Sequence, residues 1–160
     1  MKTHAILGIA IVLALLSVTA VSSAQSEITI LYAPMVIELA GERGRSVPFE
    51  ISIINQSRTS TAYFRSEVSG LLERSDGVYV PRQRDDWEFD ASDWVDLEET
   101  EFAVPPGGMH VIRGRVQIPR QSSASGYATV ITELLPEPAP PGVEASTAYH
   151  QRFTTALEIS

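Results

Sequence analysis

The chain has 160 residues, of which 44% are hydrophobic and 20% are charged, proportions typical of a globular protein that can bury one core. Its formal net charge is −8 at pH 7, and an acidic chain repels phosphate backbones, so no nucleic-acid partner is expected. Because cysteine is absent, disulfides, thiolate catalysis and cysteine-ligated zinc or iron–sulfur sites are excluded.

The N-terminus has the three parts of a secretory signal. Lys2 provides a positive start, residues 5–16 form an apolar run, and Ser22-Ser23-Ala24 places small side chains where a signal peptidase cleaves. We therefore expect residues 1–24 to be a cleaved signal peptide and residues 25–160 to form one exported domain, periplasmic or extracellular at the cell surface.

The alternative for the N-terminus is an uncleaved membrane anchor. The apolar run continues to Val21, which approaches the ~17–20 residues that span a bilayer. A membrane is expected as a partner only in this case.

The first strands follow without any segment of helical period. Residues 28–32 and 35–39 are apolar runs separated by Pro34, which predicts an edge strand that kinks or changes sheets. Residues 46–54 and 61–72 alternate between apolar and polar side chains, the period of strands with one buried face.

The middle of the chain is organised around a turn. A short strand at residues 78–80 is expected to stop at Pro81. Further on, Pro105-Pro106-Gly107-Gly108 separates two extended arms, at about residues 94–104 and 109–118. Because proline presets φ at the first corner and glycine accepts the positive φ that follows, we expect the arms to pair as an antiparallel hairpin.

The last third supplies a central strand and a final strand. Residues 126–135 are apolar and β-branched, whereas the proline-rich residues 136–142 predict a stiff extended loop. Residues 148–159 alternate again. About seven strands joined by turns, with no helix, predict an all-β, immunoglobulin-like sandwich of antiparallel strands.

Several landmarks recur in a known order. They are the opening strand with Pro34, the strand end Ile53-Ile54-Asn55-Gln56-Ser57, the stretch Phe102-Ala103-Val104-Pro105-Pro106-Gly107-Gly108, the strand end Ile118-Pro119, and Gly126-Tyr127 leading to Glu133-Leu134-Leu135-Pro136. This order resembles the N-terminal immunoglobulin-like domain of the periplasmic pilus-chaperone (PapD-like) superfamily and its secreted, chaperone-like envelope relatives.

In pilus chaperones a basic pair anchors the C-terminal carboxylate of a pilus subunit, and an exposed final strand completes the subunit's fold by strand addition. Met35 stands where the first-strand arginine of that pair is expected, so the resemblance does not extend to carboxylate anchoring. It implies an exported, non-enzymatic module of the bacterial cell envelope that contacts an envelope or surface protein through a sheet edge, formed by residues 28–39 or 148–159.

The candidate partner-binding side chains share one face of the final strand: Tyr149, Phe153, Leu157 and Ile159. The alternative is that this face packs in the core, which is what strand alternation usually reports.

A sugar-binding module is the alternative function. Trp87, Phe89 and Trp94 flank an acidic loop, and their rings could stack on a cell-wall glycan. The competing interpretation is that Trp94 covers the core and Trp87 caps the loop.

No motif predicts an active site, a metal or a cofactor. Residues 85–101 are rich in carboxylates but lack the spacing of a calcium loop, so a solvated acidic loop is expected. His110 and His150 fall in predicted strands, and there is no G-x-S-x-G elbow. Asn55-Gln56-Ser57 matches a glycosylation sequon, but we expect these side chains to end a strand by bonding the turn backbone.

Overall fold

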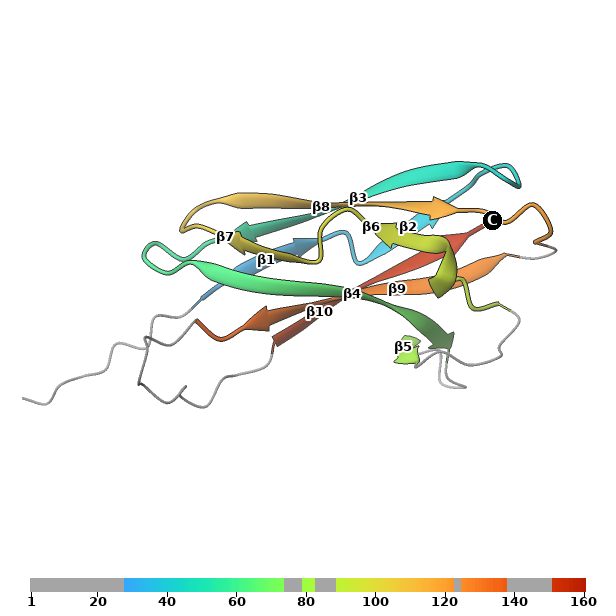
Figure 1. Cartoon of the computed structure of the whole chain (residues 1–160). Helices are drawn as coiled ribbons and strands as arrows, with labels where there is room; N and C mark the ends of the chain where they lie inside the picture. Colours follow the sequence, from blue (N-terminus) through green and yellow to red (C-terminus); the bar gives the residue numbers. More distant parts are fainter. Residues whose placement is uncertain (1–27, 74–78, 83–88, 123–124, 138–150) are drawn as a thin grey trace, which may run out of the picture.

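The computed structural model describes residues 28–73, 79–82, 89–122, 125–137 and 151–160, which form two packed β-sheets (Figure 1). Within these ranges the only helical element is the 3-10 turn η1 (Ser92–Trp94). The strands are β1 (Ile30–Ala33), β2 (Val36–Leu39), β3 (Ser46–Asn55), β4 (Ala62–Glu73), β5 (Tyr79–Arg82), β6 (Val95–Leu97), β7 (Glu101–Val104), β8 (Met109–Gln117), β9 (Gly126–Leu135) and β10 (Gln151–Ile159). The predicted all-β sandwich is confirmed, and the expected signal segment, residues 1–24, lies outside the described residues.

The two sheets have different sizes and orders. The four-stranded sheet runs β1-β3-β8-β6, and the six-stranded sheet runs β2-β10-β9-β4-β5, with β7 also paired to β4. All pairings between these strands are antiparallel except that of β2 with β10, which is parallel.

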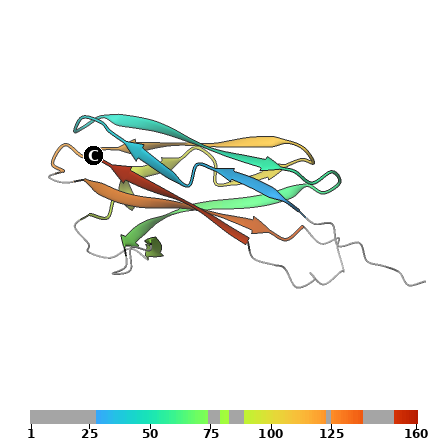
Figure 2. The same cartoon turned by 180° about the vertical axis from the view of Figure 1, so that it is seen from behind.

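The opening strand changes sheets at Pro34, as predicted. β1 pairs with β3 in the four-stranded sheet, whereas β2 pairs with β10 in the six-stranded sheet. The Ala33–Pro34 peptide bond between them is cis. Seen from behind, the blue opening strand passes along one open side of the sandwich and then runs beside the red strand β10 (Figure 2).

The predicted hairpin of residues 94–104 and 109–118 is wrong in its pairing. Only the start of the first arm, β6, pairs with β8, whereas its end, β7, pairs with β4 in the opposite sheet. The positions that face the core explain this. In β6 the inward-facing side chains are at odd-numbered positions, Val95 and Leu97, whereas in β7 they are at even-numbered positions, Phe102 and Val104. The arm therefore crosses between sheets where its alternation changes phase.

The turn itself has the predicted geometry. The Gly108 N–H donates to the Pro105 carbonyl at 2.9 Å, and Gly107 has φ +65°. Pro106 thus occupies the first corner and Gly107 the second, the arrangement of a type II turn, in which glycine accepts the positive φ. This turn connects the two sheets rather than two neighbouring strands.

The core lies between the sheets. The largest fully buried apolar side chains are Phe64, Ile51, Ile53, Leu71, Ile112 and Leu157, and all but Leu71 belong to one continuous cluster. β9 is central, as predicted, with β10 and β4 on its two sides. β5 continues through Pro81, where a stop was expected, because an edge strand tolerates proline.

Candidate binding edge

One stretch of β10 has a neighbour on one side only. β9 pairs with β10 along its whole length, whereas β2 pairs only with Ala156–Ile159. Among the described residues no strand pairs with residues 151–155 on the side away from β9. We call residues 151–155 the open edge.

The direction of the backbone groups on the open edge follows from two hydrogen bonds. The Ala156 N–H donates to the Met35 carbonyl on the β2 side, whereas the Thr155 carbonyl accepts from the Thr129 hydroxyl on the β9 side. Because successive residues of a strand point their main-chain groups to opposite sides, Thr154 and Arg152 direct their N–H and C=O groups outward from the open edge.

The open edge exists because β1 and β2 belong to different sheets. Before Pro34 the chain pairs with β3 in the four-stranded sheet, so β2 begins to pair with β10 only at Ala156. A hydrogen bond stabilises the chain where it crosses between the sheets, because the Thr155 hydroxyl donates to the Pro34 carbonyl at 2.7 Å. The same hydroxyl lies 3.0 Å from that of Tyr32 on β1.

Buried hydroxyl groups line the interior behind the open edge. Ser66 and Thr132 are hydrogen-bonded at 2.9 Å, and Thr132 and Thr155 both bond the phenol of Tyr32. Burial raises the pKa of Tyr32 above its ordinary value of 10.0, an effect that the hydrogen bonds from Thr155 and Thr132 oppose. The neutral phenol therefore ties β1 to the six-stranded sheet.

Exposed apolar side chains border the open edge. Met35 and Val36 have 59% and 51% of their surface exposed. No charged residue occurs from Ile28 to Ile37, and the one charged side chain of the open edge, Arg152, forms an ion pair with Glu133 of β9 at 3.5 Å.

The predicted partner-binding face is divided between the core and the margin of the open edge. Leu157 and Ile159 are buried in the core, and Phe153 is half-buried with its ring stacked on Tyr32 at 5.2 Å. Tyr149 lies outside the described residues. Leu157 and Ile159 thus behave as the core-packing alternative requires, and what the open edge presents is main chain.

The sequence did not single out Tyr32 or Thr155, although a signal was present. Thr155 is a polar residue at an inward position between the inward-facing Phe153 and Leu157. A hydroxyl at such a position indicates a buried hydrogen-bond partner, since buried polar groups are almost always paired.

The two described residues of the sugar-binding alternative, Phe89 and Trp94, are half-buried. Trp94 is half-buried over β9, so close that a Cβ on Gly126 would lie 2.8 Å from its ring. Phe89 is also half-buried, and its carbonyl accepts from the Tyr127 N–H. Trp87 lies outside the described residues. Trp94 therefore covers the core.

The sequon asparagine is buried. Asn55 has none of its surface exposed, and its side-chain oxygen accepts from the Ser57 N–H at 3.0 Å, which is the strand-ending role expected. In the part of the chain that the structure describes, no group of three potential ligands among His, Cys, Asp and Glu could hold a metal ion. His110, on β8, stacks on Phe102 with ring centroids 4.0 Å apart. Across the same described ranges, no helix has the length and apolarity needed to cross a bilayer.

Known proteins resemble this chain in structure but not in sequence. No family model and no curated protein matches it. The ASH/PapD-like domain of human CEP192 aligns over 81% of this chain and 82% of its own, with a TM-score of 0.52 and 10% identity. This chain has the PapD-like fold.

Fimbrial chaperones share that PapD-like fold. The class 5 fimbriae chaperone CfaA aligns over 81% of this chain and 55% of its own, with a TM-score of 0.54 and 11% identity. A chain of the chaperone–tip subunit complex of Acinetobacter baumannii Csu pili aligns over 82% of this chain and 56% of its own, with a TM-score of 0.54 and 12% identity. The chain thus spans about half the length of these chaperone structures, and the resemblance predicted from its landmarks is confirmed for the fold.

Proposed function

We propose that this chain is an exported, non-enzymatic binding module of the bacterial cell envelope that contacts a protein partner by strand addition to the open edge of β10. The observation that carries the proposal is the one-sided pairing of residues 151–155, whose outward N–H and C=O groups have no strand beside them among the described residues. Exposed edges pair with other chains unless they are protected.

The shape of the site indicates the kind of partner. An added strand would continue the line of β2 along β10, because β2 already occupies the same edge from Ala156 onward. Its inward side chains would meet the half-buried rings of Phe153 and Tyr32, and one end would meet Met35. The partner segment is therefore extended, with apolar side chains at alternate positions.

The fold family supports a protein partner. Among solved structures with this fold is a Salmonella enterica SafA pilin in complex with the SafB chaperone, at a TM-score of 0.51 and 11% identity. By analogy we assign this chain a chaperone-like role in the periplasm or at the cell surface. The described residues offer no exposed aromatic face that favours a glycan instead.

The proposal is tested by crosslinking from the open edge. The full chain is produced with a photo-crosslinking amino acid at Arg152, whose side chain is exposed, and protein adducts are identified by mass spectrometry after irradiation. Thr154→Pro removes one outward N–H, whereas Thr154→Ala retains it. We expect a discrete protein adduct that Thr154→Pro abolishes and Thr154→Ala preserves.

A crosslinker at Arg120, an exposed residue after β8, serves as the control position. An adduct formed equally from Arg120, or one whose yield is unchanged in Thr154→Pro, would show that the partner does not pair with the open edge.

A further inference from the structure

The outer face of the four-stranded sheet is divided into an apolar end and a charged end. Cross-strand pairing aligns Leu31 with Ile54 and Ile54 with Met109, which forms one apolar row across β1, β3 and β8. Two residues along, Ala33, Ser52 and Val111 form a second row without charge. We call these two rows the apolar rows.

The apolar rows are exposed. Leu31 and Met109 have 50% and 65% of their surface accessible, and they are two of the four exposed large hydrophobic residues in the described ranges. Ile54 between them is half-buried. The solvent face of an antiparallel sheet is ordinarily polar, so a set of apolar side chains aligned across three strands indicates contact with another surface.

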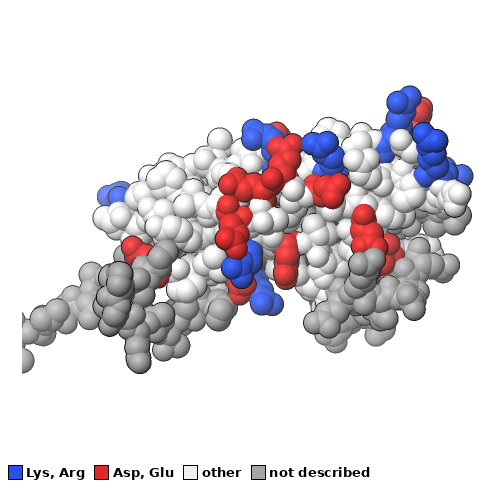
Figure 3. Space-filling model, viewed as in Figure 1, with Lys and Arg blue, Asp and Glu red and all other residues white. Residues whose placement is uncertain are grey.

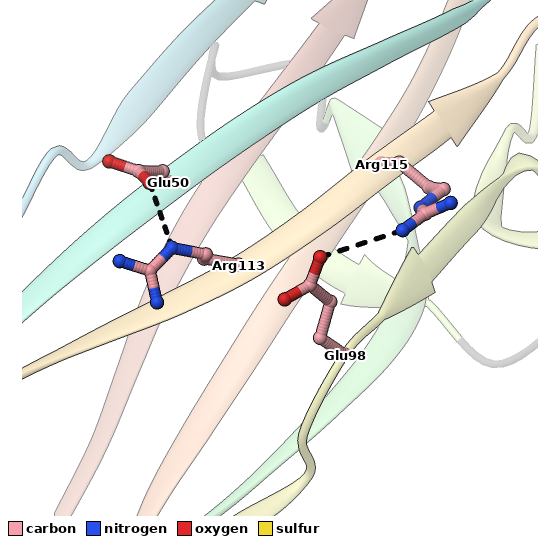
Figure 4. A network of polar contacts seen from close by, with 4 residues as sticks. All are labelled: Glu50, Glu98, Arg113 and Arg115. Carbon is pink, nitrogen blue, oxygen red and sulfur yellow. Dashed lines mark hydrogen bonds and ion pairs between the residues drawn. The ribbon is translucent and has the colours of Figure 1, made fainter.

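The charged end of the same face carries ion pairs. Arg113 on β8 contacts Glu50 on β3 at 3.0 Å, and Arg115 contacts Glu98 at 3.5 Å (Figure 4). In the space-filling view, acidic and basic side chains lie next to one another over this region rather than in a field of one sign (Figure 3). This end is therefore close to neutral on a chain whose formal net charge is −8.

We propose that this face binds the same face of a second copy of the chain, sheet against sheet. The two copies are related by a two-fold axis that lies between them, parallel to the strands and midway between β3 and β8. Such a rotation places β3 of one copy over β8 of the other at the same level of the strand. Ile54 then faces Met109 of the second copy, and Glu50 faces Arg113 of the second copy, because each pair is aligned across the ladder. The face is thus self-complementary along β3 and β8, in both apolar side chains and charges, whereas Leu31 and Ala33 on β1 face no strand of the second copy.

Other occupants fit this surface less well. The six residues of the apolar rows include no aromatic ring on which a sugar could stack and no basic group that would attract an anionic lipid. Two chains with a net charge of −8 repel each other over most of their surfaces, whereas here Glu50 of each copy meets Arg113 of the other.

The size of the face sets the strength of the contact. β3 and β8 have 10 and 9 residues and are roughly 30 Å long, whereas β1 and β6 have only 4 and 3 residues, so at about 4.8 Å between strands the face covers about 400 Å² per copy. A total of roughly 800 Å² is below the size of standard specific interfaces and is typical of weak, transient contacts. We therefore expect a reversible dimer that forms with rising concentration.

The first test measures this dimer directly. The full chain is expressed, purified as the cell processes it, and analysed by sedimentation velocity over a wide range of protein concentration. We expect Met109→Glu to raise the dissociation constant by about tenfold or more, since it places a carboxylate in the centre of an apolar contact. Val36→Glu adds the same charge at an exposed hydrophobic residue of the other sheet and is expected to leave the dimer unchanged.

The second test uses the charge pairing between copies. In a dimer of Glu50→Arg, arginines face each other at the level of residues 50 and 113, and in a dimer of Arg113→Glu, glutamates do. Because like charges repel, each variant alone should dimerise weakly. Mixed together, they should form a heterodimer, because every arginine of one chain then faces a glutamate of the other. Circular dichroism and thermal unfolding check that both variants remain folded.

Three outcomes would overturn the proposal: a chain that stays monomeric at every concentration, a dimer that Met109→Glu leaves intact, or single charge variants that fail to associate when mixed. None of these outcomes bears on the open edge of β10, which lies in the other sheet.

Discussion

The side-chain amide of Asn55 donates a hydrogen bond to the main-chain carbonyl of Val104 at 3.0 Å, across 49 positions of the chain. The same amide donates to the Ser60 carbonyl at 2.8 Å, and its oxygen accepts from the Ser57 N–H. One buried side chain therefore fastens the β3–β4 connection to the Pro105–Gly108 turn and closes this end of the sandwich.

Replacing Asn55 should destabilise the domain strongly. Asn55→Ala removes these bonds and leaves buried main-chain groups unpaired, so we expect the free energy of unfolding to fall by about 2–3 kcal/mol. Urea denaturation measures the change. Gln56→Ala, at the exposed neighbour, should alter it by less than about 0.5 kcal/mol, and equal effects of the two substitutions would contradict this role.

Gly114 on β8 is required by the ring of Phe49. An added Cβ would overlap Cζ of that ring and lie 2.9 Å from the Asp96 carbonyl oxygen. We expect Gly114→Ala to cost about 1–3 kcal/mol through overpacking, measured by thermal or urea unfolding. Phe49→Leu in the same chain should recover part of the loss, and additive effects in the double-mutant cycle would argue against the clash.

Proline substitution should distinguish the two sides of β10. Thr154→Pro removes an N–H that points out of the open edge, so we expect a cost of about 1 kcal/mol or less, as at other edge positions. Thr155→Pro removes an N–H from the β9 ladder, together with the hydroxyl that bonds Pro34, and should cost about 3 kcal/mol or more. Comparable losses of stability in the two variants would mean that the backbone directions are assigned wrongly.

Alkaline pH should weaken the domain through Tyr32. Because burial raises the pKa of its phenol above 10.0, the unfolded chain releases this proton first as the pH rises. The contribution of Tyr32 is complete below pH 10.0 and is lost above it. We expect the free energy of unfolding of Tyr32→Phe to fall less steeply with pH in this range than that of the unsubstituted chain. Lys2 is the only lysine of the chain, so lysine side chains contribute almost nothing to the pH dependence in this range.

Local patterns in the sequence were sufficient to predict most strands. The period-two alternation of residues 46–54 matches β3, which differs from it by one residue at its end. The proline between two apolar runs correctly indicated a change of sheet at residue 34. Both signals are local, because side-chain alternation and proline geometry depend on neighbours in the chain.

Pairing partners were less predictable, because they are decided by distant contacts. Nothing near Glu101–Val104 shows that β7 joins β4, although the change of phase after Leu97 indicates a crossing. The open edge was likewise hidden. It depends on where β2 starts beside β10, and therefore on a parallel pairing that joins the second and the last described strands.

That parallel pairing has a kinetic consequence. Val36 is aligned with Ala156, so the two partners are separated by 120 positions (156 − 36). As the chain is synthesised, β1 can find β3 early, but β2 must wait for almost the entire domain before its neighbour exists. Contacts of such long sequence separation slow folding, and until β10 emerges the six-stranded sheet lacks the strand that joins β2 to β9. We therefore expect the six-stranded sheet to be completed only after β10 has been synthesised.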